Sequence, residues 1–135
     1  MSYDLMVFDP AAAPQDRSAF KKWYEKQTDW GEGHAYDDPS VCSDRLRAWF
    51  LDMITLFPPM NGPHATEDFD DPKVTDYSVG SNAIYAAFAW SEASSARATM
   101  LELAQKHRVG FFDVSSKDSG IWQPTRAGGY ARVAW

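Results

Sequence analysis

The sequence predicts an α+β domain in which helices pack on one face of a mainly antiparallel sheet. Three observations carry this prediction. Two stretches show apolar side chains at the 3.6-residue period of a helix, several short apolar runs have the length of strands, and turn residues separate these segments. At 135 residues, the chain is long enough to build one core but not two, so we expect residues 1–135 to form a single domain.

The apolar run at residues 83–90 is the expected centre of the sheet. Its four alanines favour helix, but the residues on either side favour a strand. Val79-Gly80-Ser81-Asn82 is typical of a hairpin turn, and Ser91 is a suitable N-cap for a following helix. The alanines would let a helix approach the sheet closely. The bulk of the strand comes from four larger side chains: Ile84, Tyr85, Phe88 and Trp90.

The N-terminal half supplies one strand and two helices. Residues 3–8 form the first strand, which Asp9-Pro10 ends. A helix is expected at 14–28, with Pro14 in its first turn. A second helix at 44–57 would be capped by Ser43 and stopped by Pro58-Pro59. The periodic side chains of the two helices are Phe20, Trp23, Tyr24 and Gln27 in the first, and Leu46, Trp49, Phe50, Met53, Ile54 and Phe57 in the second.

The C-terminal half supplies the remaining elements. A strand at 74–79 pairs with 83–90, and a third helix runs from Ser91 to a stop at Gly110. Strands at 111–115 and 121–123 follow. The tail at 125–135 is expected to be loosely ordered coil with a potential edge strand.

The resulting order is β-α-α-β-β-α-β-β. Without the extra helix and the last strand it becomes β-α-β-β-α-β, the split βαβ arrangement of ferredoxin-like folds. Right-handed crossovers then place the helices on one sheet face. The other face must be covered by the long loops, by the tail or by a partner.

The charge distribution narrows the choice of partner. The net charge is −6, and residues 1–76 carry 15 of the 19 acidic side chains. Nucleic acid is disfavoured because phosphate binding needs clustered lysine and arginine. An acidic surface would instead steer a basic protein toward the chain.

The cellular compartment is predicted from absences in the sequence. The single cysteine, Cys42, cannot form an internal disulfide and fits a reducing compartment. Its acidic surroundings argue against a catalytic thiol. We see no signal peptide and no apolar run long enough to cross a membrane, so we expect a cytoplasmic protein without membrane contact.

Two long acidic loops are the candidate binding surface, because long irregular stretches within a compact domain are often functional. Aromatic side chains in these loops would serve as anchors, and the acids would steer or pair with a basic partner. From the first loop, at 31–42, and the residue before it, the candidates are Trp30, Glu32, His34, Tyr36, Asp37 and Asp38. From the second, at 60–76, they are Asn61, His64, Glu67, Asp68, Asp70 and Asp71.

No motif in the chain predicts catalysis, a cofactor or a metal. The run at 67–71 lacks the calcium-loop pattern, and the three histidines lack zinc-ligand spacing. No phosphate loop or nucleophile elbow occurs. Two alternatives to protein binding stay open. One is a small hydrolase or transferase using His34 or His64 with Asp70 or Asp71. The other is a ligand-binding homo-oligomer, such as a homodimer paired through the open sheet face.

Several stretches resemble, taken together, small bacterial proteins of the immunity type, which are encoded beside polymorphic or type VI secretion toxins. The similar segments, all within residues 3–123, are 3–8, Phe20-x-x-Trp23-Tyr24-x-x-Gln27-x-x-Trp30, Asp38-Pro39, Leu46-x-x-Trp49-Phe50, 57–63, 76–78, 85–90 and 110–114. The resemblance implies a non-catalytic inhibitor that binds and neutralises a cognate toxin. For an acidic protein without an export signal, the implied toxin is basic and acts in the cytoplasm, as a nuclease would.

Overall fold

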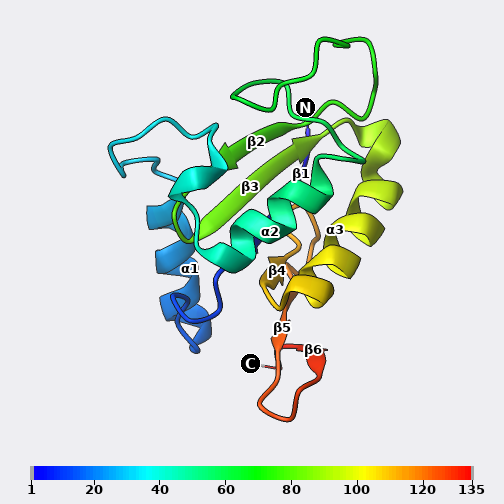
Figure 1. Ribbon diagram of the computed structural model, residues 1–135. Helices are drawn as coiled ribbons and strands as arrows, with labels where there is room; N and C mark the ends of the chain where they lie inside the picture. The colour runs from blue at the N-terminus through cyan, green and yellow to red at the C-terminus, as the bar shows by residue number, and fades with distance from the viewer. Residues whose placement is uncertain (1, 135) are drawn as a thin grey trace.

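The computed structural model describes residues 2–134 and shows a six-stranded antiparallel sheet of strand order β2-β3-β1-β4-β5-β6 (Figure 1). The strands are β1 (Tyr3–Phe8), β2 (Asp76–Val79), β3 (Ala83–Phe88), β4 (Gly110–Phe112), β5 (Ile121–Pro124) and β6 (Tyr130–Arg132). The helices are α1 (Arg17–Gln27), α2 (Asp44–Met53) and α3 (Ala93–His107), with short 3-10 helices η1 (Pro39–Val41) and η2 (Trp90–Glu92). The predicted α+β class and antiparallel sheet are confirmed, and the order of β2, β3, β1 and β4 is that of a ferredoxin-like sheet.

Strand β1 is the centre of this sheet. It pairs with β3 along its whole length, from Tyr3 opposite Phe88 to Phe8 opposite Ala83, and with β4 on its other side. Because side chains alternate along a strand, Leu5 points to one face and Met6 to the other. Both are fully buried, so each face of the sheet carries a core of its own.

The larger core lies between the sheet and helices α2 and α3. Trp49 of α2 is fully buried there, and its indole N–H donates to the Met100 carbonyl of α3 at 3.3 Å. The small side chains Ala96 and Ala104 of α3 are also fully buried, which lets the two helices lie close together over the strands. These two helices give the predicted helical layer on one sheet face (Figure 1).

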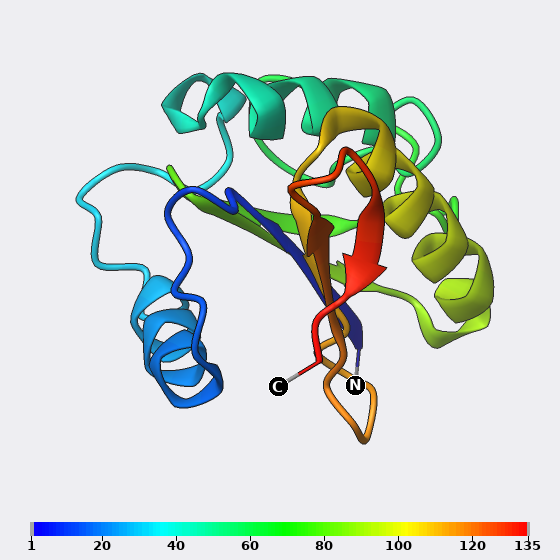
Figure 2. The same ribbon diagram turned by 90° about the horizontal axis from the view of Figure 1, so that it is seen from below.

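Helix α1 lies across the opposite face (Figure 2). Phe20 packs edge-on against Phe8 and Phe112, and Trp23 and Tyr24 border the same cluster. The helix of the split βαβ unit between β1 and β2 is therefore α2. The apolar stripe of α1 predicted a packed helix correctly, but such a stripe does not specify which sheet face it covers.

Several element boundaries differ from the sequence prediction for local reasons. Helix α1 begins at Arg17 instead of residue 14, because the Asp16 carboxylate caps it by accepting from the Ala19 N–H. Helix α2 ends at Met53, and three hydrogen-bonded turn residues follow it. Helix α3 ends at His107, before the expected stop at Gly110, because its C-cap residue Arg108 adopts the left-handed conformation (φ 59°).

The start of α3 also differs. The η2 turn precedes it, so Ser91 is not its N-cap. Strand β3 ends at Phe88, and Trp90 is 51 % exposed, resting edge-on against Tyr3 instead of filling the core. The predicted edge strand in the tail is confirmed as β6, whose three residues pair with β5.

Candidate functional site

The first loop, residues 31–42, is fastened to the β2–β3 turn by its own polar side chains. The Glu32 carboxylate accepts from the backbone N–H of Ser81 at 3.0 Å and pairs with His34 Nε2 at 2.8 Å. Burial, the largest influence on Glu32, raises the pKa of its carboxyl group, but the hydrogen bonds from Ser81 and His34 outweigh it and hold that pKa below its usual range. The Val79 N–H donates to the Tyr36 carbonyl at 2.9 Å, which adds a second attachment to the sheet.

Trp30 and Tyr36 are half-buried against each other and do not stand free in solvent. Their rings meet edge-on with centroids 5.0 Å apart, and the Tyr36 hydroxyl accepts from the Glu32 N–H. Trp30 has a left-handed backbone (φ 55°), a conformation that bulky residues rarely adopt. The loop therefore holds its aromatic side chains in place at some backbone cost.

The second loop, between α2 and β2, is tied at its neck. The Thr75 N–H donates to the Pro58 carbonyl at 2.9 Å, and the Met60 N–H donates back to the Thr75 carbonyl at 3.1 Å. Thr75 is fully buried, although it is polar, and its hydroxyl donates to the Lys73 carbonyl. Figure 1 shows the resulting loop projecting from the end of the sheet near the start of α3.

The two loops meet, although both are acidic. Gly62 lies so close to Asp37 that a Cβ atom built on this glycine would stand 2.2 Å from the Asp37 carbonyl oxygen. Asp38 uses its carboxylate to cap η1 through the Ser40 N–H, which lowers the pKa of Asp38, and the nearby His64 lowers it further. The 12 candidate residues thus lie on two touching loops, although Asp37 and Asp38 contribute to holding the loops as well.

The tip of the second loop combines an exposed aromatic ring with acids. Phe69 is 66 % exposed, and its neighbours Glu67, Asp68 and Asp70 are exposed as well. Asp71 is partly buried and accepts from the Lys73 N–H, so it shapes the turn. Sequence reasoning selected the acids but missed Phe69. The available signal was a single large apolar residue inside a charged run, without the periodic partners of a core position.

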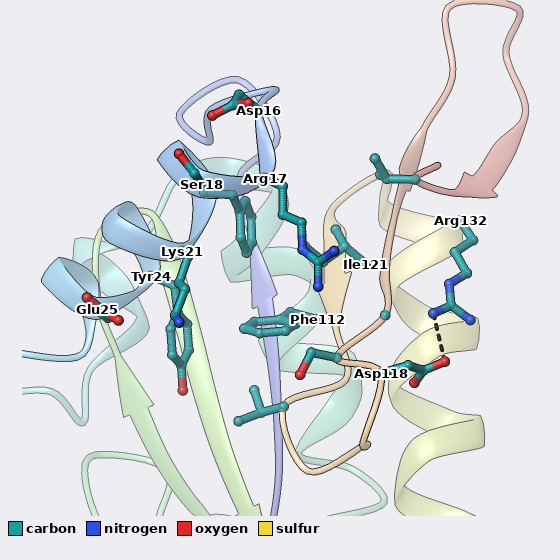
Figure 3. A pocket seen from close by; sticks show the side chains of 15 residues that line it. Asp16, Arg17, Ser18, Lys21, Tyr24, Glu25, Phe112, Asp118, Ile121 and Arg132 are labelled. Carbon is teal, nitrogen blue, oxygen red and sulfur yellow. Dashed lines mark hydrogen bonds and ion pairs between the residues drawn. The ribbon is translucent and has the colours of Figure 1, made fainter. Parts of the chain in front are cut away.

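A separate hollow of about 980 Å³ lies between α1 and strands β4–β6 (Figure 3). Phe20, Phe112 and Ile121 line its apolar part, while Arg17 reaches in from α1. On the far rim, Asp118 forms an ion pair with Arg132 at 2.8 Å. The hydrogen bond with Ser116, and to a smaller extent this ion pair, lower the pKa of Asp118 to about 2. This hollow contains none of the residues selected from the sequence.

The surroundings of Cys42, the histidines and the loop acids bear on the alternative of a small enzyme. Burial raises the pKa of the Cys42 thiol to about 12, so this cysteine is not a nucleophile near neutral pH. Within residues 2–134, no three His, Cys, Asp or Glu side chains form a group that could hold a metal ion. The hollow beside α1 is not lined by His34, His64, Asp70 or Asp71.

The fold and loops define an α+β protein in which the second loop exposes the Phe69 ring among carboxylates. No family model, curated protein or solved structure matches the chain. Among the described residues, none of the helices has the length and apolar character needed to cross a membrane.

Proposed function

We propose that this protein is a non-catalytic binding module of the immunity type, which neutralises a basic protein toxin by covering its working surface. The support comes from the sequence resemblance within residues 3–123 and from the acidic loops. The proposed toxin is a cytoplasmic one delivered by a secretion system, and its inhibitor would then be cytoplasmic as well.

The observation that carries the proposal is the exposed Phe69 ring within a rim of carboxylates. Aromatic side chains that become buried at an interface dominate its binding energy, while the surrounding polar residues exclude water and set specificity. Glu67, Asp68 and Asp70 have no ion pair within residues 2–134. Their charges are therefore available to lysine and arginine side chains of a partner.

An acidic inhibitor suits a nuclease in particular. A nuclease holds its phosphate substrate in a cationic groove, and a protein surface with the same sign of charge as phosphate competes for that groove. Long-range attraction also raises the association rate, and salt reduces this effect. Binding by this surface should therefore slow markedly as ionic strength increases.

The test begins with capture of the tagged protein from its native cells and identification of bound proteins by mass spectrometry. We expect one stoichiometric basic partner that is encoded next to this protein and is toxic when produced alone. Co-production of the two proteins should restore growth. A protein that captures no such partner, or does not protect against it, would contradict the proposal.

Variants then test the surface itself. Phe69→Ser should weaken binding of the captured partner at least tenfold. A tenfold loss corresponds to about 1.4 kcal/mol of interface energy. Leu56→Ser is the matched control, since Leu56 is 54 % exposed but precedes the loop. Equal effects of the two substitutions, or full binding by Phe69→Ser, would place the interface elsewhere.

The hollow beside α1 favours a second candidate function, which is the binding of a small amphipathic anion. Arg17 and Lys21 line it from one helix face and form no ion pair within residues 2–134, so they are free for a carboxylate. A fluorescence titration with dodecanoate tests this candidate. Arg17→Glu should weaken dodecanoate binding at least tenfold. Lys22→Glu, on the same helix but outside the hollow, should leave binding unchanged. Absence of dodecanoate binding would exclude this function.

A further inference from the structure

A second, smaller hollow lies on the other side of α1, over strands β2 and β3. Its volume is about 310 Å³, at the small end of the range for ligand sites. Tyr24 lines both hollows, so its ring separates them. The remaining aromatic walls are Trp30 and Tyr85, and the acidic group is Asp76.

The aromatic walls form a corner. The rings of Trp30 and Tyr85 are 6.3 Å apart between centroids and stand at 80° to each other. Trp30 is held there by its left-handed backbone and by its edge contact with Tyr36. The two rings meet edge to face, so one ring stands on the other and the two faces form a corner against which an ammonium group can lie.

The polar groups of the tyrosines are already engaged. The Tyr85 hydroxyl donates to the Asp4 carboxylate at 2.5 Å, and the Tyr24 hydroxyl forms a hydrogen bond with that of Tyr85. Burial and the hydrogen bond to Asp4 raise the pKa of Tyr85, so its phenol remains neutral. The aromatic rings therefore define these walls, and their hydroxyl groups are committed elsewhere.

The charge of the hollow is negative. Asp76 is exposed at the edge of β2 and forms no ion pair within residues 2–134. Asp4 lies behind Tyr85, and its carboxylate accepts from the hydroxyl groups of Ser2 and Tyr85. No lysine, arginine or histidine lines the space. An aromatic corner with an unpaired carboxylate at its mouth is complementary to an organic cation.

We propose that this hollow is an aromatic cage for an ammonium group, namely the side chain of a lysine that the basic partner inserts between Trp30 and Tyr85. The identity of the occupant rests on the proposed function, whereas the cage itself does not. The lysine ammonium would lie against the ring faces and form an ion pair with Asp76.

The cage is tested without any partner, by NMR titration of the ¹⁵N-labelled protein. The probes are Nα-acetyl-lysine amide, choline and the neutral choline isostere 3,3-dimethylbutan-1-ol. We expect the two cations to shift the indole N–H signal of Trp30 and the backbone amide of Ser78, with dissociation constants of about 1 mM or weaker, as suits a single small group. The neutral isostere should bind at least fivefold more weakly than choline.

Two matched variants locate the charge. Asp76→Asn should weaken choline binding at least fivefold, because it removes the carboxylate while keeping the shape of the side chain. Glu102→Gln makes the same change on the exposed side of α3, outside the hollow, and should have no effect. Equal binding of choline and its isostere, equal effects of both variants, or no shift at Trp30 would overturn the cage.

The same data distinguish a lysine of the partner from a free ammonium compound. They also test the cage separately from the proposed function. Tighter binding of choline than of the lysine derivative would mean that the occupant of the cage is a free quaternary ammonium compound and not a lysine of the partner. If the cage binds cations but Asp76→Asn leaves affinity for a captured partner unchanged, the cage stands and its role in partner binding is wrong. If the cage fails while Phe69→Ser still weakens the partner, only the cage is wrong.

Discussion

The contact between Gly62 and Asp37 can be broken by adding a single methyl group. Gly62 has φ 88°, and a Cβ atom there would lie 2.2 Å from the Asp37 carbonyl oxygen and 2.9 Å from the Asp37 Cβ. Gly62→Ala therefore has two costs. A left-handed alanine costs about 1–2 kcal/mol, and relieving the clash by moving one loop away from the other adds about 1–3 kcal/mol.

Gly33→Ala is the matched control. Gly33 has nearly the same backbone conformation, with φ 85°, but nothing lies within 4 Å of its Cβ position. It should therefore show the backbone cost alone. The difference between the two variants measures how strongly the second loop packs against the first.

The assay is urea unfolding monitored by tryptophan fluorescence, together with amide NMR spectra. We expect Gly62→Ala to lower the free energy of unfolding by about 1–3 kcal/mol more than Gly33→Ala. The amide signals around Asp37 should shift in that variant. Equal free energies and unchanged signals at residues 36–38 would refute the idea that the two loops form one packed surface.

Three further predictions concern single side chains. Burial raises the pKa of the Cys42 thiol to about 12, so Cys42 should react with a thiol reagent at pH 8 only after the protein unfolds. Rapid reaction of the folded protein would contradict the burial of Cys42. Hydrogen bonds to the Ala35 carbonyl and to Glu32 raise the pKa of His34. Protonated His34 should therefore stabilise the first loop fully below about pH 6.5, and this stabilisation should be lost as the pH rises through the raised pKa. Hydrogen exchange of the loop amides, measured against pH, would show or exclude this loss. Tyr77→Phe should cost about 1–2 kcal/mol in urea unfolding, because the Phe57 carbonyl loses a buried donor at 2.7 Å; an unchanged midpoint would mean that water replaces the hydroxyl.

The sequence was sufficient for most of the sheet because its local signals agree. The apolar run at 83–90 and the turn at Gly80 predicted β3 and its hairpin with β2, and the Gly80 N–H does donate to the Ala83 carbonyl at 2.8 Å. Trp90 was misplaced for a simple reason. It continues an apolar run, but the chain turns into η2 after Phe88, and no local feature marks where pairing with β1 ends.

The position of α1 depends on information that the local pattern lacks. The stripe containing Phe20 and Tyr24 shows that one side of the helix is buried, and both sheet faces offer apolar side chains to receive it. Its selection of the second face creates the two hollows that flank it. Neither hollow could be predicted from sequence, because each is formed by residues far apart along the chain, such as Arg17 with Ile121 and Trp30 with Asp76.

The candidate loops were recognised from composition, but their internal contacts were not. Glu32 and His34 were expected to face a partner, but the structure shows them hydrogen-bonded to each other, and Glu32 also accepts from the Ser81 N–H. Acids in a loop can serve either purpose, since a carboxylate accepts equally well from a neighbouring backbone N–H and from a partner. Only the three-dimensional arrangement separates the acids that hold the loop from those that remain available.

The hydrogen bonds that join Thr75 to Pro58 and Met60 have an evolutionary consequence. They close the second loop at its base, so the chain on either side of the loop is held together independently of the loop tip at residues 65–72. The entropic cost of closing a loop rises only slowly with its length. Residues 65–72, whose hydrogen bonds stay within the loop, can therefore be lengthened, shortened or replaced at little cost to the rest of the domain, so one stable scaffold can carry loop tips of different chemistry.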